Sequence, residues 1–147
     1  MAIQTLIGLV RWKMDWKDEP GPWRLNAESV IDVLGKKPLA IGVYFIGYCE
    51  TGKHKDFELK YCGKAVDQPL FKRLNQHINK SSNVHIREHL TSKKANKKKV
   101  WFRFKEFGSP QLAELAEGVV IAAFLWNVKG TWNQRNEWRQ HWAAEDD

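Results

Sequence analysis

Two short runs in the middle of the chain have the residue pattern of paired β-strands. Residues 42–47, Gly-Val-Tyr-Phe-Ile-Gly, and residues 60–65, Lys-Tyr-Cys-Gly-Lys-Ala, contain aromatic and β-branched side chains, which favour extended backbone. A polar link that contains a glycine joins the two runs, so we predict a β-hairpin. A helix is predicted next, with Pro69 in its first turn and with Leu70 and Leu74 at helical spacing.

The pattern on either side of this centre predicts four further elements. Asn26 can cap a helix over 27–34, and residues 85–90 suit one or two helical turns. Residues 100–107 favour a strand, and a helix follows from about 110 to 126 with Ser109 as its N-cap. Together these elements predict an α/β fold, α+β in the stricter scheme. Its sheet is small, three-stranded and mainly antiparallel, and it is flanked by helices.

Length and composition bound the organisation of the chain. Its 147 residues suit one domain, with an N-terminal helical arm at 1–38, a core at 39–135 and a tail at 136–147. Within the arm, residues 16–23 are turn-rich. Two cysteines make no disulfide framework. No run predicts a membrane span, and the apolar start lacks the basic leader of a signal peptide, so we expect a cytoplasmic protein.

The charge balance favours a polyanionic partner. Lysine and arginine total 24 against 17 acidic residues, which gives a net charge of +7, and nucleic acid is the commonest partner of such a chain. A dense basic run would hold the phosphates of a duplex without reading its bases. The alternative is a solvated loop on a soluble basic protein. The run comprises Lys93, Lys94, Lys97, Lys98 and Lys99.

The ordered motifs along the chain resemble those of the GIY-YIG nuclease family. Gly42-Val43-Tyr44 stands where the family has its Gly-Ile-Tyr element, and Tyr61-Cys62-Gly63 stands where it has Tyr-Ile-Gly. Arg73 and His77, four residues apart, share one face of the helix that follows. The resemblance covers about residues 40–133 and implies the GIY-YIG nuclease fold.

Details of the motifs resemble different branches of that family. Gly63-Lys64-Ala65, followed by Lys72-Arg73-Leu74, resembles the nuclease half of the UvrC repair proteins. The position of His77 after Arg73 resembles the restriction and homing branches. Glu117 and the apolar residues after it match the family's acidic position, whereas we expect Glu114 to be an exposed helix charge.

The resemblance implies a one-metal site for phosphodiester hydrolysis. Glu117 would be the sole protein ligand of one Mg²⁺ or Mn²⁺ ion, and Arg73 would clamp the scissile phosphate. Lys64 would support the phosphate charge. Asn133, after Trp132, is the expected counterpart of the family's asparagine near the substrate, with Asn127 as the competing choice.

The resemblance also implies a tyrosine as the general base. We favour Tyr44, with Tyr61 orienting the water or the phosphate, although the reverse assignment stays open. We expect Arg73 and Lys64 to lower the pKa of that tyrosine, because nearby cations favour a phenolate. His77 would then accept a proton from the tyrosine or bond the phosphate.

The function that these residues predict is metal-dependent cleavage of DNA. A restriction-type, sequence-specific enzyme is one form of this prediction, and cleavage of a palindrome would favour a homodimer. The alternatives are a structure-selective nuclease of repair, recombination or mobile elements, and a nucleic-acid-binding module without catalysis.

Overall fold

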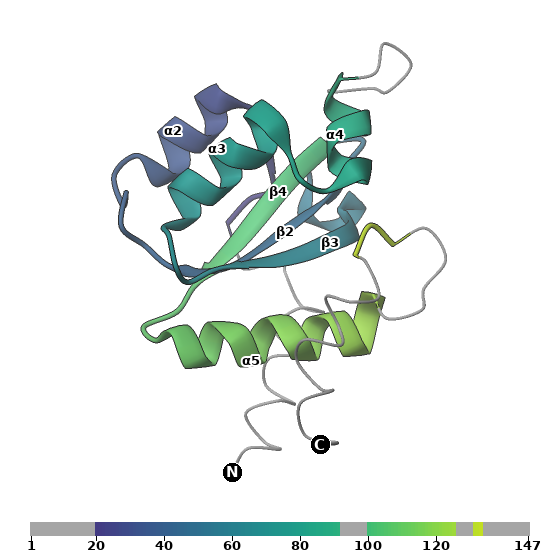
Figure 1. The fold of residues 1–147 in the computed structure, drawn as a ribbon. Helices are drawn as coiled ribbons and strands as arrows, with labels where there is room; N and C mark the ends of the chain where they lie inside the picture. The colour runs from purple at the N-terminus through teal and green to yellow at the C-terminus, as the bar shows by residue number, and fades with distance from the viewer. Residues whose placement is uncertain (1–19, 92–99, 126–130, 134–147) are drawn as a thin grey trace.

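The computed structural model describes residues 20–91, 100–125 and 131–133, which form a mixed α+β fold around a four-stranded antiparallel sheet (Figure 1). The strand order is β1-β4-β2-β3. The predicted hairpin and the predicted strand over 100–107 are both confirmed. A 3₁₀ turn, His54–Asp56, lies in the hairpin's link. The strands are β1 (Trp23–Arg24), β2 (Gly42–Tyr48), β3 (Glu58–Ala65) and β4 (Val100–Glu106).

The prediction of three strands is wrong, because β1 adds a fourth at the edge of β4. Trp23 pairs with Phe102, and the Trp23 ring also stacks on Phe104 at a centroid distance of 5.6 Å. This strand lies at the end of the segment that we predicted as a turn-rich loop. Aromatic packing across the sheet stabilises the pairing of β1 with β4. A strand of two residues next to prolines and polar residues has no local sequence pattern that would predict it.

In the part of the chain that the structure describes, four helices flank the sheet, and two of them begin at side-chain caps that the sequence indicates. Asn26 Oδ1 accepts a hydrogen bond from Ser29 N–H at 2.8 Å, and Ser109 Oγ accepts one from Leu112 N–H at 3.2 Å. Pro69 is the N-cap, with extended backbone, rather than a residue of the first turn. The helices are α2 (Ala27–Leu34), α3 (Leu70–Lys80), α4 (Val84–Thr91) and α5 (Pro110–Val120), and a π-helical segment, Ile121–Leu125, follows α5.

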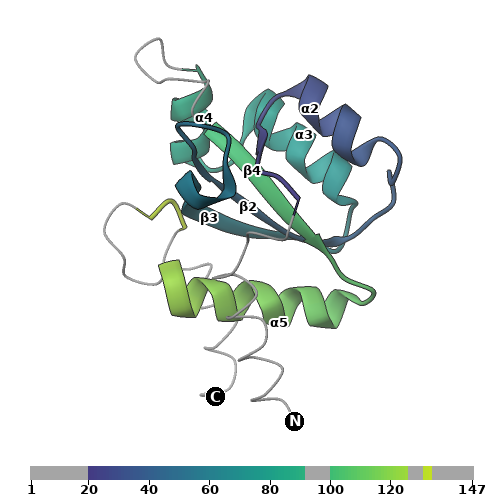
Figure 2. The same cartoon turned by 180° about the vertical axis from the view of Figure 1, so that it is seen from behind.

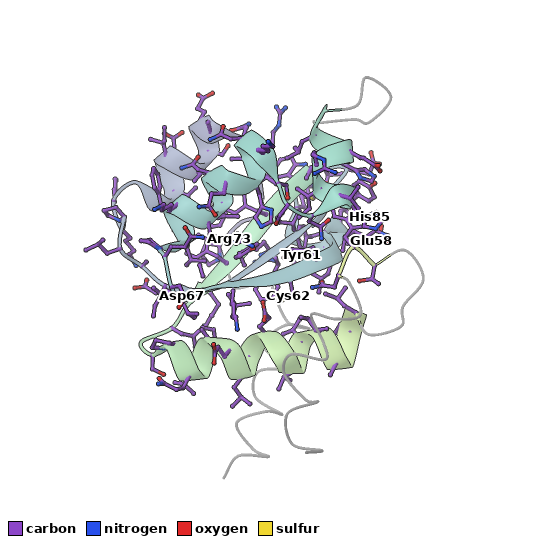
Figure 3. The ribbon with its side chains drawn as sticks, viewed as in Figure 1. Glu58, Tyr61, Cys62, Asp67, Arg73 and His85 are labelled. Atoms are coloured by element: carbon purple, nitrogen blue, oxygen red, sulfur yellow. The ribbon has the colours of Figure 1, made fainter. Side chains whose placement is uncertain are left out.

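The helices form two layers, one on each face of the sheet. α2, α3 and α4 cover one face and α5 covers the other, as the opposite views of Figures 1 and 2 show. Because side chains alternate along a strand, β2 contributes to both cores. Tyr44 and Ile46 pack under α3, whereas Val43 and Phe45 pack against α5. Figure 3 shows the same alternation on β3, with Tyr61 on the α3 side and Cys62 on the α5 side.

The segment 131–133 closes the outer edge of β3. Trp132 N–H donates to Lys60 O at 2.8 Å. The side chain of Asn133 then satisfies both backbone groups of Cys62, since Cys62 N–H donates to Asn133 Oδ1 and Asn133 Nδ2 donates to Cys62 O, each at 2.9 Å. The Asn133 amide therefore replaces one rung of a neighbouring strand.

Several predictions of the sequence concern residues outside the described ranges. They include the first part of the N-terminal arm, the basic run within 92–99, Asn127 and the tail. Among the described helices, none has both the length and the apolar composition that a bilayer crossing requires.

Gly63 is a position in the sheet where the packing leaves no room for a side chain. A methyl group on Gly63 would overlap Tyr44 Cζ and Oη, and pairing with β2 on one side restrains the Gly63 backbone. We expect Gly63→Ala to lower the free energy of unfolding by about 1–3 kcal/mol, measured by urea denaturation.

Gly108→Ala is the matched control for this substitution. A methyl group at Gly108 meets no atom within 4 Å, so we expect a change within about 0.5 kcal/mol. Equal losses at the two positions would contradict the packing that we describe at Gly63.

Candidate active site

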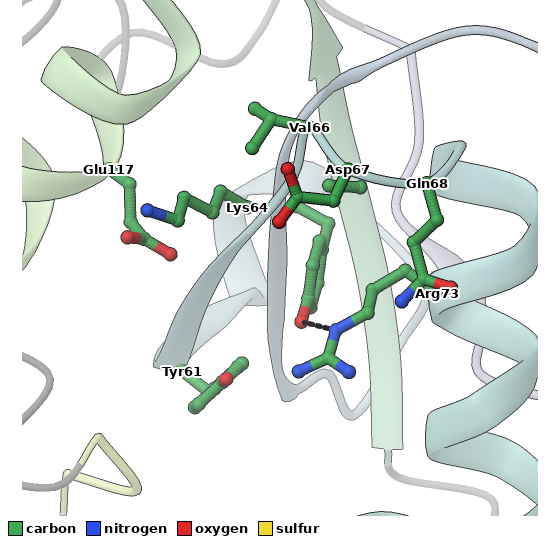
Figure 4. Close-up of a pocket in the computed structure, with 9 residues that line it drawn as sticks. Tyr61, Lys64, Val66, Asp67, Gln68, Arg73 and Glu117 are labelled. Carbon is green, nitrogen blue, oxygen red and sulfur yellow. Dashed lines mark hydrogen bonds between the residues drawn. The ribbon is translucent and has the colours of Figure 1, made fainter. Parts of the chain in front are cut away.

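A cavity of about 360 Å³ lies at the end of β3, the last strand of the sheet (Figure 4). Its walls come from both faces of the sheet. Tyr44 and Tyr61 reach it from the α3 side, whereas Glu117 reaches it from α5. Because β3 ends the strand order, side chains of the two layers can meet around its edge. The cavity is lined by Tyr44, Tyr61, Lys64, Ala65, Val66, Asp67, Gln68, Arg73 and Glu117.

Five of the candidate residues that the sequence singles out come together here, namely Tyr44, Tyr61, Lys64, Arg73 and Glu117. Of the five proposed catalytic residues, four line the cavity and His77 lies directly behind Tyr44. Asp67 and Gln68 also line it, although no motif of the sequence singled them out. Their place between the Tyr61 strand and the Arg73 helix was the signal that could have found them.

Tyr44 is the centre of the hydrogen bonding at this site. Its side chain is fully buried, and Tyr44 Oη lies 2.7 Å from His77 Nε2. Arg73 Nε donates to the same oxygen at 3.3 Å, as the dashed line in Figure 4 marks. The rings of Tyr44 and Tyr61 lie 6.0 Å apart.

The pKa of Tyr44 runs opposite to the sequence-based expectation. Burial raises the pKa of Tyr44 to about 12, although the Arg73 guanidinium acts to lower it. Lys64 is not among the groups that shift the pKa of Tyr44, and its Nζ pairs with Glu114 Oε1 at 3.1 Å. The expectation of a lowered tyrosine pKa is therefore wrong for Tyr44 in this state, and Tyr44 is a protonated phenol at neutral pH.

His77 is a buried, neutral imidazole. Burial, with a smaller contribution from Arg73, lowers the pKa of His77 to about 3. Its Nε2 meets Tyr44, and its Nδ1 lies 2.7 Å from Ser81 Oγ. This geometry points the imidazole at the tyrosine and not into the cavity. Ser81 was not predicted as a partner of His77, because a serine among polar neighbours gives no signal by itself.

Two glutamines hold Arg73 in place. Arg73 Nη1 donates to Gln76 Oε1 at 3.2 Å, and the amides of Gln76 and Gln68 bond each other at 2.8 and 2.9 Å. The guanidinium is thereby tied both to its own helix and to the loop before it. Such a fixed, planar donor suits a phosphate.

Glu117 is the carboxylate that best fits a metal ion. It is 8% exposed and lines the cavity, whereas Glu114, one turn earlier, is exposed as expected. A hard divalent cation takes oxygen ligands from a carboxylate, waters and a phosphate, and Asp67 adds a second carboxylate to the same cavity. Within the described ranges, no three His, Cys, Asp or Glu side chains gather into a larger cation site.

Asn133 lies away from the cavity wall. Its amide forms two hydrogen bonds with the backbone of Cys62, next to Tyr61. Asn133 therefore stabilises the strand that carries Tyr61. The five lysines of the basic run fall outside the described residues, and their role stays a prediction.

A second, smaller cavity of about 180 Å³ adjoins the first along α3. Arg73 lines both cavities, and no acidic side chain of the described ranges lines the second. The polar face of α3 therefore carries positive charge from one cavity to the other. The second cavity is lined by Arg73, Gln76, His77, Lys80, Ser81 and Ser82.

Comparisons with protein-family models, with curated proteins and with solved structures gave no match to this chain. The likeness to GIY-YIG nucleases accordingly stays a resemblance of motifs. What the structure adds is that the motif residues Tyr44, Tyr61 and Arg73 share one cavity with Glu117.

The neutral state of His77 makes the stability of the fold depend on pH. The pKa of His77 is about 3 in the folded chain and 6.5 ordinarily. Between these values the unfolded chain binds a proton that the folded chain does not, so stability falls as the pH falls. Above pH 6.5 the titration of His77 takes nothing from the free energy of unfolding, and as the pH falls toward 3 it lowers that free energy progressively. We expect at most about 1.4 kcal/mol per pH unit from this group.

Urea denaturation at several pH values between 4 and 7 measures this dependence. His77→Gln should flatten it, whatever the substitution does to stability at pH 7. His85→Gln, on the exposed face of α4, is the control. A slope that His77→Gln leaves unchanged would contradict a neutral, buried imidazole at this site.

Proposed function

We propose that this protein is a metal-dependent endonuclease that hydrolyses phosphodiester bonds in DNA by the one-metal chemistry of GIY-YIG nucleases. The observation that carries the proposal is the convergence of Tyr44, Arg73 and Glu117 on one cavity. These side chains come from a strand, a helix on one face of the sheet and a helix on the other. Their chemistry is the set that phosphodiester hydrolysis needs: a proton acceptor, a phosphate clamp and a metal ligand.

Arg73 is placed to hold the scissile phosphate. Gln76 and Tyr44 fix two of its nitrogens, so the guanidinium is already oriented before a phosphate binds. Glu117 would hold Mg²⁺ or Mn²⁺, which supplies Lewis acidity toward the phosphate oxygens when bound. Tyr61, on the same cavity wall, is left to orient the water or the phosphate.

Tyr44 is the proposed general base, and its high pKa sets a condition on that role. With a pKa of about 12, its phenolate is scarce but strongly basic. A phosphate bound to Arg73 would partly offset the positive charge that stabilises the Tyr44 phenolate. Tyr44 Oη therefore needs a hydrogen-bond donor besides Arg73. His77 is the nearest such group, 2.7 Å away.

DNA is the proposed substrate because of charge. The chain carries a net charge of +7, and the second cavity continues the positive face of α3 beyond the first. A restriction-type enzyme acting as a homodimer and a structure-selective repair, recombination or mobile-element nuclease both fit this surface. The rival class is a module that binds nucleic acid without cutting it.

Cleavage of a supercoiled plasmid in Mg²⁺ or Mn²⁺ tests the proposed activity. Glu117→Gln should reduce the cleavage rate by about 100-fold or more, because it removes the charge on the proposed metal ligand. Glu114→Gln is the matched control on the same helix, and we expect its rate to stay within about threefold of wild type.

Binding without metal-dependent cleavage, on plasmid and on branched DNA, would favour the non-catalytic module. Equal rates for Glu117→Gln and wild type would remove Glu117 from the metal site. Discrete bands would indicate a sequence-specific enzyme, and a smear or nicked plasmid would indicate low or structure-based specificity.

The second cavity predicts where the DNA strand runs. If a phosphate next to the scissile one lies over Lys80, Lys80→Ala should reduce the slope of log affinity against log salt concentration by about 0.9. The measurement is fluorescence anisotropy of a labelled duplex in Ca²⁺ at several salt concentrations.

Lys72→Ala is the control for this measurement. Lys72 is exposed on the same helix and lines neither cavity, so the slope should stay near the wild-type value. Equal reductions for both variants would indicate a diffuse basic surface and not a strand held along the two cavities.

A further inference from the structure

A buried chain of hydrogen bonds runs from Tyr44 to the backbone of Asn83. Tyr44 Oη lies 2.7 Å from His77 Nε2, and His77 Nδ1 lies 2.7 Å from Ser81 Oγ. Asn83 N–H donates to Ser81 Oγ at 3.1 Å. The side chains of Tyr44, His77 and Ser81 are at most 2% exposed. The direction of each hydrogen bond therefore depends on the protein groups around them.

The donors and acceptors along this chain can be counted. A backbone N–H only donates, so Ser81 Oγ accepts from Asn83 and keeps one hydrogen of its own to give. Among the described residues, the acceptor that Ser81 Oγ meets is His77 Nδ1. If the Ser81 hydroxyl donates there, Nδ1 is the bare nitrogen and the single hydrogen of the neutral ring is on Nε2.

We propose that Ser81 is a positioning residue that holds His77 in the Nε2–H tautomer, so that the imidazole donates a hydrogen bond to Tyr44 Oη. The direction is opposite to that of the expected proton transfer, in which His77 accepts the proton of the tyrosine. The catalytic consequence of the inference rests on the proposed function, but the tautomer itself does not.

In this arrangement Tyr44 Oη receives two N–H groups. His77 Nε2–H and Arg73 Nε–H, the latter at 3.3 Å, both favour negative charge on the oxygen. The hydroxyl hydrogen of Tyr44 then points toward the cavity, and solvent water there, not the imidazole, takes the proton when the phenolate forms. When Arg73 binds a phosphate, the hydrogen bond from His77 Nε2–H to Tyr44 Oη remains.

The rest of the fold holds Asn83 in the place that this direction requires. Asn83 Oδ1 accepts from His85 N–H and Ile86 N–H at 3.0 and 3.1 Å, which caps α4. Asn83 Nδ2 donates to Trp132 O at 2.9 Å. The backbone N–H that occupies Ser81 is thus anchored to α4 and to the segment at the edge of β3.

Nitrogen-15 NMR of the histidine rings reads the tautomer directly and needs no substrate. In the wild type we expect His77 with a protonated Nε2 and a bare Nδ1. Ser81→Ala removes the donor to Nδ1 and should populate the Nδ1–H tautomer, whereas Ser81→Thr keeps a hydroxyl and should restore the wild-type pattern. Ser82→Ala, at the neighbouring exposed serine, should leave the tautomer of His77 unchanged.

A wild-type ring with Nδ1 protonated would overturn the inference, and this result does not depend on whether any variant folds. An unchanged Nε2–H tautomer in folded Ser81→Ala would remove Ser81 from the role. Either outcome leaves the proposed nuclease activity standing, because the metal ligand and the phosphate clamp are separate groups.

Cleavage by His77 variants tests the consequence. Gln can place an amide N–H near the position of Nε2, so His77→Gln should stay within about tenfold of wild type, whereas His77→Leu should lose about 100-fold or more. Equal, large losses in both would indicate that His77 takes a proton. If the wild type cuts no DNA while its ring has the Nε2–H tautomer, the proposed function fails and the inferred tautomer remains.

Discussion

The packing of Tyr44 across Gly63 is the constraint on which the rest of this site depends. The phenol crosses the neighbouring strand only because Gly63 has no side chain there. Its hydroxyl thereby reaches Arg73 and His77, two residues on one face of α3. One buried oxygen therefore joins the hairpin to the helix and sets the position of Arg73, the proposed phosphate clamp. A polar atom buried at this depth is stable only with such partners.

The second constraint is the edge of β3. A site that uses both faces of a sheet must lie where the sheet ends, and here Tyr61 and Glu117 approach from opposite layers. The exposed edge also needs hydrogen-bond partners. Asn133 supplies them at Cys62 while the end of the strand, near Lys64, stays open to the cavity. One part of β3 is thus stabilised by Asn133, and another part lines the cavity that a substrate would enter.

The elements that the sequence predicted well are those with a local physical signal. Alternation and turn chemistry indicated the hairpin, and the caps Asn26 and Ser109 marked two helices where the structure has them. Strand β1 has no local signal because aromatic packing on β4 makes it. The raised pKa of Tyr44 and the role that we propose for Ser81 depend on burial and on donors far apart in the chain, which spacing does not show. The motif residues were found from a resemblance, and only the folded chain brings them together.

The central claim is that a metal ion at Glu117 and a phosphate at Arg73 meet in one cavity. Anomalous diffraction from crystals grown with Mn²⁺ and a short duplex with an uncleavable phosphate linkage tests it most directly. The account predicts a manganese peak beside the Glu117 carboxylate, with the modified phosphate between the ion and the Arg73 guanidinium. Manganese bound away from Glu117, or DNA that lies outside the cavity, would contradict it.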